Sequence, residues 1–351
     1  MTNHRATAPQ SRAITVPATL DAALDPAWLS QAFDRPVASV ETVEVIRTVA
    51  TKVRFAVTFA DSPEPEGFCL KGLLDVDAMT ARGGSTCVLE ADFYGKVAPT
   101  VDVRVPECVV TVVDREAQQA VIIMRDLIAS GARFCSALEA FSADDAAQSL
   151  GQLAALHRGR ALLDQAPWIR ARVADLAQMN YVSVDMLQEL LDGPRGDGLS
   201  PAVRSAERLG AGMKALAAAD AARPDFLVHG DSHAGNVFRT AEGAGLIDWQ
   251  LLQRGGWALD VAYHLNAVLP IDVAEREERR LLNEYLGQMR AAGFAMPDDE
   301  QAWREYREAA LYGYYLWSIT RRVDPPIIVQ FVQRLGHAVT RHESHALLGV
   351  A

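Results

Sequence analysis

Short runs of β-branched and other apolar residues, separated by polar turns, fill the first third of the chain. Runs of this length and composition are typical of strands. A first hairpin is expected to join Val43–Ile46 to Val53–Val57, and the turn Asp61–Gly67 leads to a third strand at Phe68–Leu73. Ala120–Met124 predicts the last strand of this region.

Helical signals accompany these strands. Asp21–Phe33 predicts a short helix before the first strand, and Thr86–Lys96 predicts a longer helix with Ser85 as its N-cap. Residues 1–20 mix Arg, His, Ser, Pro and Thr without a continuous apolar run. A disordered N-terminus is therefore expected for this segment.

After residue 124 the pattern changes to Ala, Leu, Arg and Glu at helical spacing. Ser142 and Asp145 cap a helix that is expected to end near His157. Further helices are expected at Trp168–Leu191, Ala202–Ala219, Ala258–Val268, Asp272–Ala292, Asp298–Arg321 and Pro326–Glu343. The predicted fold class is α+β with two lobes. An N-terminal antiparallel sheet with one main helix (residues 21–124) is joined by a hinge near residues 124–128 to a mostly helical C-terminal lobe (residues 125–351).

Composition narrows the partners of the chain. Half of its 351 residues are hydrophobic, and its formal net charge is −11. This negative charge argues against nucleic acid or an anionic membrane as a partner, and no apolar run is long enough to span a bilayer. The four cysteines show no C-x-x-C spacing, and no signal peptide is visible, so a cytoplasmic protein with reduced thiols is expected. No pattern indicates an oligomeric state.

The most informative polar segment is His229–Asn236, which reads His-Gly-Asp-Ser-His-Ala-Gly-Asn. An Asp, four intervening residues and an Asn, followed twelve residues later by Asp248 at the end of an apolar run, suit phosphoryl transfer from a Mg-nucleotide. Asp231 is expected to be the catalytic base that accepts the proton of an attacking hydroxyl. Asn236 and Asp248 are expected to bind Mg²⁺ through oxygen atoms.

The two histidines of this segment are expected to support it. His229 precedes the loop and suits bracing of the loop backbone. His233 suits loop support or phosphate contact, and loop support is the favoured reading. β-type runs flank the segment, which makes a chance collection of turn-forming residues a poor explanation.

A kinase also needs a lysine for the α- and β-phosphates and a glutamate that holds this lysine. Lys71 interrupts the apolar run Phe68–Leu73, where an unpaired lysine would be costly unless it points to water from an edge strand. Glu90 lies in the predicted helix Thr86–Lys96 and is expected to pair with Lys71. Asp92 points in a different direction around that helix and is the less favoured partner.

Nucleotide contacts are also expected at two backbone segments. The first hairpin tip, residues 47–52, has no glycine, so Thr48 and Thr51, with Lys52 or Arg47, could replace a glycine-rich phosphate loop. The same residues could equally form an ordinary hairpin tip. Met124 and Asp126 belong to the predicted hinge, where adenine would bind to the backbone.

The segments His229–Asn236, Ile247–Gln250 and Gly256–Ala262 resemble the superfamily of aminoglycoside phosphotransferases, choline kinases and ecdysteroid kinase-like proteins. Leu153–His157 is similar to a helix end in the same group. The Trp-Gln after Asp248 favours the ecdysteroid kinase-like branch. The resemblance implies a protein-kinase-like fold, ATP and Mg²⁺ as cofactors, and a role for Asp260 in bracing the catalytic loop by hydrogen bonds.

The predicted function is an ATP-dependent phosphotransferase that acts on a hydroxyl of a small molecule whose identity the sequence leaves open. One alternative is a metal-dependent phosphoesterase, since Gly230–His233 resembles the first metal motif of two-metal enzymes, although the further ligand motifs of that class are missing. The other is a kinase fold that only binds. Tyr312, Tyr314, Tyr315, Trp317 and Arg321 could line an acceptor pocket, but a core role is favoured for most of them.

Overall fold

The computed structural model describes residues 6–47, 50–76, 84–178 and 181–350. The chain forms two compact units, Met1–Arg133 with Arg239–Gln250 and Phe134–Phe238 with Leu251–Ala351, called unit 1 and unit 2 below. The segment Arg239–Gln250 was expected in the second lobe but groups with unit 1. The backbone N–H of Leu246, which donates to the carbonyl of Arg104, helps to hold it there.

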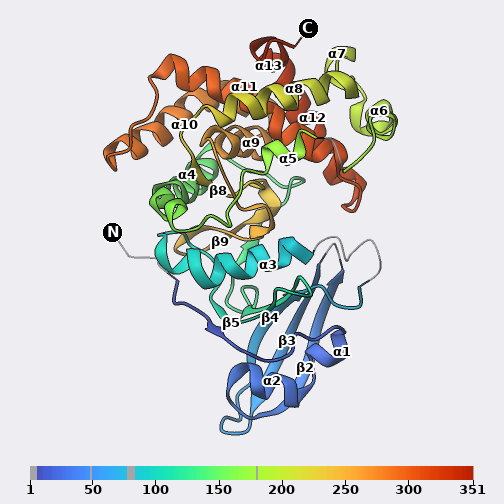
Figure 1. The fold of residues 1–351 in the computed structure, drawn as a ribbon, viewed down its shortest axis with the longest axis vertical. Helices are drawn as coiled ribbons and strands as arrows, with labels where there is room; N and C mark the ends of the chain where they lie inside the picture. The colour runs from blue at the N-terminus through green and yellow to red at the C-terminus, as the bar shows by residue number, and fades with distance from the viewer. Residues whose placement is uncertain (1–5, 48–49, 77–83, 179–180, 351) are drawn as a thin grey trace. The chain divides into compact units, whose positions relative to one another are not determined.

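Unit 1 is built on a six-stranded sheet in the order β1-β5-β6-β4-β3-β2. Its strands are β1 (Gln10–Ser11), β2 (Val37–Arg47), β3 (Thr51–Phe59), β4 (Glu66–Gly72), β5 (Cys108–Asp114) and β6 (Gln119–Arg125). Its helices are α1 (Leu20–Ala23), α2 (Pro26–Phe33) and α3 (Gly84–Asp92), with a π-helix at Phe93–Val97 and a 3₁₀ turn at Ala98–Thr100 (Figure 1).

The sheet differs from the predicted antiparallel one at its edge. β1 pairs parallel to β5, with Gln10 opposite Val110, so the sheet is mixed. The remaining strand pairs are antiparallel. Residues 10–20 are also ordered, in contrast to the disorder predicted for them, because Thr15 accepts the Nε1–H of Trp28 and Ile14 packs against the core of the sheet.

The sheet has two different faces. In β3 every second residue from Thr51 to Phe59 is buried, and the apolar ones, from Val53 to Phe59, form a hydrophobic core with Leu29 and Ala32 of α2. Lys52 lies on the opposite face, directly across from Lys71 on β4. Since directly opposed residues share a face, α2 covers one face of the sheet and Lys71 points from the other.

Local chemistry explains where helices differ from their predictions. The expected helix Asp21–Phe33 is split, because Asp25 is extended and caps α2, whose first residue is Pro26. Ser85 lies inside α3 and is not its N-cap, and the helix continues as a π-helix from Phe93 instead of remaining α-helical to Lys96.

Unit 2 is mostly helical, as expected. Its helices are α4 (Ala143–His157), α5 (Val173–Leu176), α6 (Val184–Asp192), α7 (Pro201–Arg204), α8 (Ala206–Ala221), α9 (Ala258–Val268), α10 (Ile271–Ala291), α11 (Asp299–Ile319), α12 (Pro325–Arg341) and α13 (Ser344–Leu347), with 3₁₀ segments at Arg158–Asp164 and Pro194–Gly196. Strands β8 (Phe226–Val228) and β11 (Gln253–Gly255) pair antiparallel. The strands β7 (Arg133–Phe134), β9 (Val237–Thr240) and β10 (Gly243–Leu246) form a three-stranded sheet in the order β10-β9-β7. Of these strands, β10 belongs to unit 1, and the boundary between the units falls within β7 and within β9.

The C-terminal helices agree with the sequence pattern to within a few residues, and the capping box of Ser142 and Asp145 is present. The expected helices Trp168–Leu191 and Ala202–Ala219 are wrong as continuous elements. Ser183 caps α6, and Ser205, whose backbone is extended, separates α7 from α8 and caps α8. Each residue of α9 is buried, so this helix forms the centre of unit 2.

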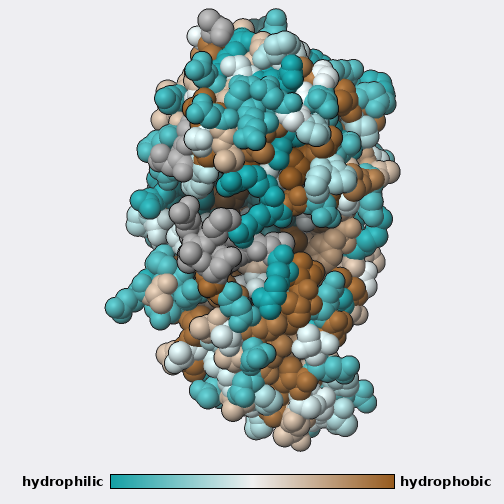
Figure 2. Space-filling view, turned by 90° about the vertical axis from the view of Figure 1, so that its right-hand side faces the viewer, coloured by the Kyte–Doolittle hydropathy of each residue, from teal (hydrophilic) through white to brown (hydrophobic). Residues whose placement is uncertain are grey.

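Few large apolar side chains are exposed on the surface of the described residues. Figure 2 shows hydrophilic and hydrophobic residues interspersed, with a hydrophobic streak at the level of the strands of unit 1. Val43, Val45 and Ile46 of the edge strand β2 are among the exposed large hydrophobic residues. Of the helices in the described ranges, none is both long enough and apolar enough to cross a membrane.

Candidate active site

Unit 1 brings three residues named in the sequence analysis, Glu90, Asp248 and Lys52, together with Lys71 in one cluster. The Lys71 ammonium lies 2.7 Å from Glu90 Oε2 and 3.0 Å from Asp248 Oδ1. Lys52 Nζ lies 3.4 Å from Asp248 Oδ2. The predicted ion pair of Lys71 with Glu90 is confirmed, whereas the contacts of Asp248 with both lysines were not predicted.

Because Lys71 and Glu90 are buried, their charged states depend on the ion pairs that they form. Lys71 is 4% exposed and Glu90 is 1% exposed. Burial lowers the pKa of Lys71, but attraction by Asp248 and Glu90 outweighs it and raises this pKa above its ordinary value. The lysine therefore stays charged, and two carboxylates share it. Asp92 instead pairs with Arg115 and Lys96, as its direction on the helix predicted.

The backbone around Asp248 is held by Glu90 and by an aromatic stack. Asp248 has a φ of +66°, a left-handed conformation that Asp adopts more readily than most residues. The next residue, Trp249, donates its backbone N–H to Glu90 Oε1 at 3.4 Å, and its ring stacks on Phe93 at 3.6 Å between centroids. The π-helix that starts at Phe93 thus supports the metal-site candidate, a contact that the sequence did not predict.

Thr48 and Thr51 at the hairpin tip and Met124 in the last strand are predicted to contact nucleotide. Thr51 is buried, and its hydroxyl donates to the carbonyl of Leu74 at 3.4 Å, while Thr48 lies outside the described residues. Met124 is buried in β6. Thr51 is thus engaged in a structural bond, and nothing in its geometry supports a phosphate contact.

Asp126 is committed to the structure of the chain. Its carboxylate accepts from the Arg54 guanidinium and caps the turn that follows it, at Ile128. Its backbone N–H donates to Gly67, and its carbonyl accepts from the backbone and hydroxyl of Ser130. Because both backbone groups are engaged, the prediction that Asp126 binds adenine is not supported.

Unit 2 holds the segment His229–Asn236 on a buried carboxylate. Asp260, at the start of α9, accepts the backbone N–H of His229 at 2.7 Å and of Gly230 at 2.9 Å. The His157 ring lies 3.1 Å from the same carboxylate, which with backbone hydrogen bonds holds the pKa of Asp260 below its ordinary value despite burial. The predicted bracing role of Asp260 is therefore present in the structure.

Glycine is required at position 230. Its φ is +81°, and a Cβ there would lie 2.3 Å from the carbonyl oxygen of Leu251. Any side chain would push the loop away from the backbone of Leu251, the last residue of the 3₁₀ turn Trp249–Leu251. Gly230 therefore fixes the path of the backbone one residue before Asp231.

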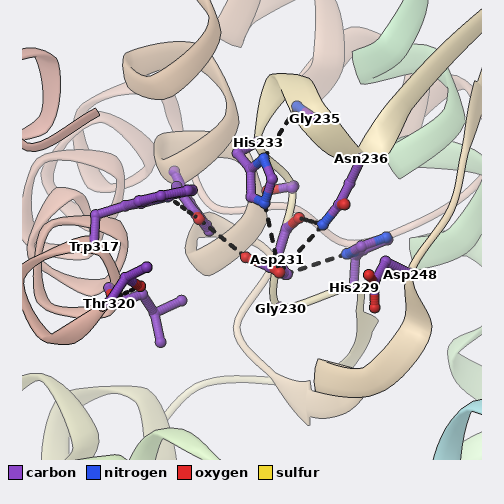
Figure 3. A network of polar contacts seen from close by, with 12 residues as sticks. His229, Gly230, Asp231, His233, Gly235, Asn236, Asp248, Trp317 and Thr320 are labelled. Carbon is purple, nitrogen blue, oxygen red and sulfur yellow. Dashed lines mark hydrogen bonds and ion pairs between the residues drawn. The ribbon is translucent and has the colours of Figure 1, made fainter. Parts of the chain in front are cut away.

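Asp231 sits at the centre of a set of hydrogen bonds (Figure 3). Its Oδ1 accepts from the Tyr263 hydroxyl at 3.0 Å, and its Oδ2 accepts from Asn236 Nδ2 at 3.2 Å. His229 Nδ1 accepts the backbone N–H of Asp231 at 3.2 Å. The carboxylate side chain keeps 26% of its surface exposed to solvent.

His233 acts as the predicted support of the loop. Its Nδ1 accepts the backbone N–H of Gly235 at 3.0 Å, and its ring packs edge-on against Trp317 and Phe331 (Figure 3). Its Nε2 lies 3.6 Å from Asp231 Oδ2, beyond a normal hydrogen bond. These contacts match loop support.

Asn236 turns its amide nitrogen toward Asp231. Its Nδ2 donates to the carbonyl oxygen of Asp231 at 2.8 Å and to the Asp231 carboxylate, so the amide oxygen points away from Asp231. Among the described residues, no cluster of three or more His, Cys, Asp or Glu side chains is arranged to hold a metal ion. A Mg²⁺ site does not need such a cluster, because Mg²⁺ usually binds one or two protein oxygen ligands and completes its coordination shell with water and substrate phosphates.

The sequence analysis did not predict the support that three residues give to this site. Tyr263 donates to Asp231, Trp317 donates to the Tyr263 hydroxyl, and the His157 ring contacts the Asp260 carboxylate. Tyr312, Tyr314 and Tyr315 are fully buried, in agreement with the favoured core role, and Arg321 is exposed. A buried aromatic residue on a helix has the same sequence pattern whether it touches a catalytic group or only the core, so no local signal distinguishes Tyr263 or Trp317.

A buried histidine ties the catalytic segment to α9 and makes the stability of unit 2 depend on pH. His264 Nδ1 lies 2.6 Å from the carbonyl oxygen of Ser232, and Nε2 lies 2.7 Å from Ser149 Oγ. Burial lowers the pKa of His264 to about 4. Since the folded pKa is below the ordinary value, the unfolded chain binds the proton more readily, and stability falls as pH decreases from about 6.5 toward 4.

We expect wild-type protein to lose about 1 kcal/mol of unfolding free energy between pH 7.5 and pH 5.5 through His264. His264→Asn keeps a donor for Ser232 but does not titrate, so it should lack this part of the pH dependence. Urea unfolding of both proteins at the two pH values measures the difference. Equal losses in both proteins would show that His264 does not contribute.

A model of the Phosphotransferase enzyme family matches residues 82–308, more than half of the chain. Among solved structures, a protein from Ralstonia eutropha that is provisionally named an aminoglycoside phosphotransferase aligns with 92% of this chain and 96% of its own at 14% identity and a TM-score of 0.51. Choline kinase LicA from Streptococcus pneumoniae aligns with 88% of this chain and 94% of its own, at 14% identity and a TM-score of 0.46. An ethanolamine kinase from Plasmodium vivax aligns with 87% and 81%, at 14% identity and a TM-score of 0.47.

No curated protein sequence matches the chain significantly. At these identities the structural likeness concerns the fold, and it confirms the predicted kinase-like α+β class. The predicted superfamily is also confirmed, whereas its ecdysteroid kinase-like branch stays a prediction. Because the family model covers more than half of the chain, including Glu90, the segment His229–Asn236 and Asp260, the chain belongs to the Phosphotransferase enzyme family.

Proposed function

We propose that this protein is a kinase that transfers the γ-phosphoryl group of ATP to a hydroxyl of a small molecule. The observation that carries the proposal is the arrangement of Asp231, a partly exposed carboxylate held by Tyr263 and by Asn236, five residues along the chain. An oriented carboxylate that a substrate can reach suits a general base. Asn236, whose amide oxygen points away from this base, suits a metal ligand.

Each remaining residue has a role in this proposal. Lys71 is the cation for the α- and β-phosphates, and Glu90 holds it in place at 2.7 Å. Asp248 binds Mg²⁺, and a carboxylate offers roughly four lone-pair sites, enough to contact lysine and a metal together. When bound, Mg²⁺ neutralises charge on the phosphate oxygens.

Lys52 is a further candidate for binding phosphate, because residues 47–52 contain no glycine and cannot form a glycine-rich phosphate loop. It faces Lys71 across the strand pair β3–β4 and shares Asp248 with it, and its side chain is 30% exposed. An exposed ammonium beside a buried one adds a second positive charge for triphosphate. We therefore assign Lys52 the phosphate contact that backbone N–H groups make in glycine-rich loops.

The acceptor is tested directly. The protein is incubated with Mg-ATP and a library of sterol alcohols, aminoglycosides, amino alcohols, sugars and hydroxyacids, and ADP release is measured together with the mass of the acceptor. We expect one class to release ADP above background and to gain the mass of one phosphoryl group. Hydrolysis of simple phosphate esters without nucleotide, and no transfer to any acceptor, would favour the phosphoesterase alternative instead.

A further inference from the structure

The hydroxyl of Tyr263 contacts the proposed base, although Tyr263 lies 32 residues further along the chain. It donates to Asp231 Oδ1 at 3.0 Å from the central helix α9. Trp317 of α11 donates its Nε1–H to the same hydroxyl at 2.6 Å. Tyr263 is fully buried and Trp317 is 5% exposed. Two helices therefore reach the base through one chain of hydrogen bonds.

The chemistry of the donors fixes the direction of this chain. An indole N–H can only donate, whereas a phenol hydroxyl has one proton to donate and can also accept. Because Trp317 donates into the Tyr263 oxygen, the phenol proton is left for Asp231. Burial, and then the charge of Asp231, raise the pKa of Tyr263 well above its ordinary value, which keeps this proton on the phenol.

Packing leaves the Tyr263 ring little freedom to move. Gly313 of α11 faces it so closely that a Cβ there would lie 2.3 Å from the ring. The Tyr312 ring packs edge-on at 6.0 Å between centroids. At the other end of this series of hydrogen bonds, the Trp317 ring packs against the Phe331 ring of α12, at 4.1 Å between centroids. The hydroxyl is thus held at a fixed place beside the loop.

The two oxygens of Asp231 are fixed by different elements. Tyr263 holds Oδ1 from α9, and Asn236 holds Oδ2 from within the loop. Rotation of the carboxylate about its terminal bond would break both bonds. A base whose lone pairs are oriented before substrate binds does not need to be ordered during the reaction.

We propose that Tyr263 is a positioning residue for Asp231 and that Trp317 orients the Tyr263 hydroxyl. This inference rests on the proposed function, because it concerns the base of that reaction. Tyr263 touches neither nucleotide nor acceptor in this assignment. Its loss should therefore lower kcat and leave the KM for nucleotide unchanged.

Tyr263→Phe removes the hydroxyl and keeps the ring. We expect kcat to fall by roughly ten- to a hundredfold, the scale of a misplaced catalytic group. Tyr314→Phe is the matched control. It removes another fully buried hydroxyl in unit 2, from α11, where Tyr314 donates to the carbonyl of Val203 at 3.1 Å, away from Asp231. This control should lose similar stability in urea unfolding and keep wild-type kcat.

Trp317→Phe tests the hydrogen bond from Trp317 to the Tyr263 hydroxyl and keeps an aromatic side chain against Phe331. It should lower kcat less than Tyr263→Phe, because the phenol can still donate once the indole is gone. The double variant should have the kcat of Tyr263→Phe alone, because Phe at position 317 keeps an aromatic ring against His233 and Phe331 and removes only the donor to the Tyr263 hydroxyl. If the kcat losses of the two single variants multiply in the double variant, Trp317 does not act through Tyr263, and the proposed series from Trp317 through Tyr263 to Asp231 is wrong.

The outcomes separate this inference from the proposed function. If wild-type protein transfers phosphate and Tyr263→Phe has the kcat of Tyr314→Phe, the positioning role is wrong and the kinase assignment stands. If Tyr263→Phe changes only the nucleotide KM, the positioning role is also wrong. If wild-type protein transfers phosphate to no acceptor, the proposed function fails, and this inference fails with it.

Discussion

Replacing Asp231 by Asn is expected to lower kcat by roughly 10³-fold, within the range that a general base contributes. The amide that replaces the carboxylate cannot accept the proton of the attacking hydroxyl. The size of the side chain is unchanged, and Tyr263 can still donate to the remaining oxygen. Asn236 also keeps its bond to the backbone carbonyl of residue 231, 2.8 Å long in the wild type. The loop should therefore persist.

Nucleotide binding separates this effect from unfolding. Since Asp231 is assigned no contact with nucleotide, the dissociation constant for Mg-ATP should match that of wild type in calorimetric titration. Asp225→Asn provides a control six residues earlier, where a 42% exposed carboxylate pairs loosely with Arg254 at 3.7 Å. This control should keep wild-type kcat. Phosphoryl transfer at an undiminished rate by Asp231→Asn would remove Asp231 from the mechanism.

Replacing Lys71 by Met should destabilise the protein by about 3–5 kcal/mol at pH 8, the cost of breaking a buried ion pair from one side. Glu90, fully buried in α3, would then face Asp248 without the ammonium that both carboxylates share. The same change removes the cation assigned to the phosphates. Mg-ATP affinity should fall together with stability.

The pH dependence of this loss identifies its cause. In wild type, burial already raises the pKa of Glu90, the attraction of Lys71 lowers it, and the repulsion of Asp248 raises it again. Without Lys71 the pKa rises further, so the folded state holds a proton that the unfolded chain releases. The deficit is then largest at high pH and shrinks as pH falls through the folded pKa. Urea unfolding at pH 8 and pH 6 measures it.

Two further variants complete the experiment. Adding Glu90→Gln to Lys71→Met removes the unpaired buried charge and should restore most of the stability at pH 8, without restoring Mg-ATP affinity. Lys52→Met is the matched control, because Lys52 contacts the same Asp248 from the neighbouring strand but is 30% exposed. Its loss should cost less than about 1 kcal/mol. A similar cost for both lysines would contradict the role given to burial.

Residues that lie close in sequence were the ones most readily predicted. Asp231 and Asn236 share one loop, so their spacing alone indicated a base and a metal ligand. The ends of α9 to α12 followed from periodicity, because an amphipathic or fully apolar run must bury its apolar side wherever the helix packs. The pairing of Lys71 with Glu90 could be predicted because a lysine inside an apolar strand needs a partner.

Long-range geometry escaped prediction. The parallel pairing of β1 with β5, the contact of Lys52 with Asp248 and the donation from Tyr263 to Asp231 each join segments far apart in the chain. The split of the helix expected at Asp21–Phe33 is a different error, since Asp25 and Pro26 carried a local signal that was overlooked. The adenine contact predicted for Asp126 is not supported because both of its backbone groups already form hydrogen bonds within the chain, to Gly67 and Ser130, and the sequence carried no signal of these contacts.

By itself the sequence determined the family, the class of reaction proposed and the residues that carry charge, because these depend on residue type and local spacing. Only the tertiary structure decided how the charges are held. It pairs Lys71 with two carboxylates in unit 1, and it fixes both oxygens of Asp231 in unit 2. Hydrogen bonds and ion pairs act over about 3 Å, and which distant side chains come within that range follows from the packing of whole helices and strands.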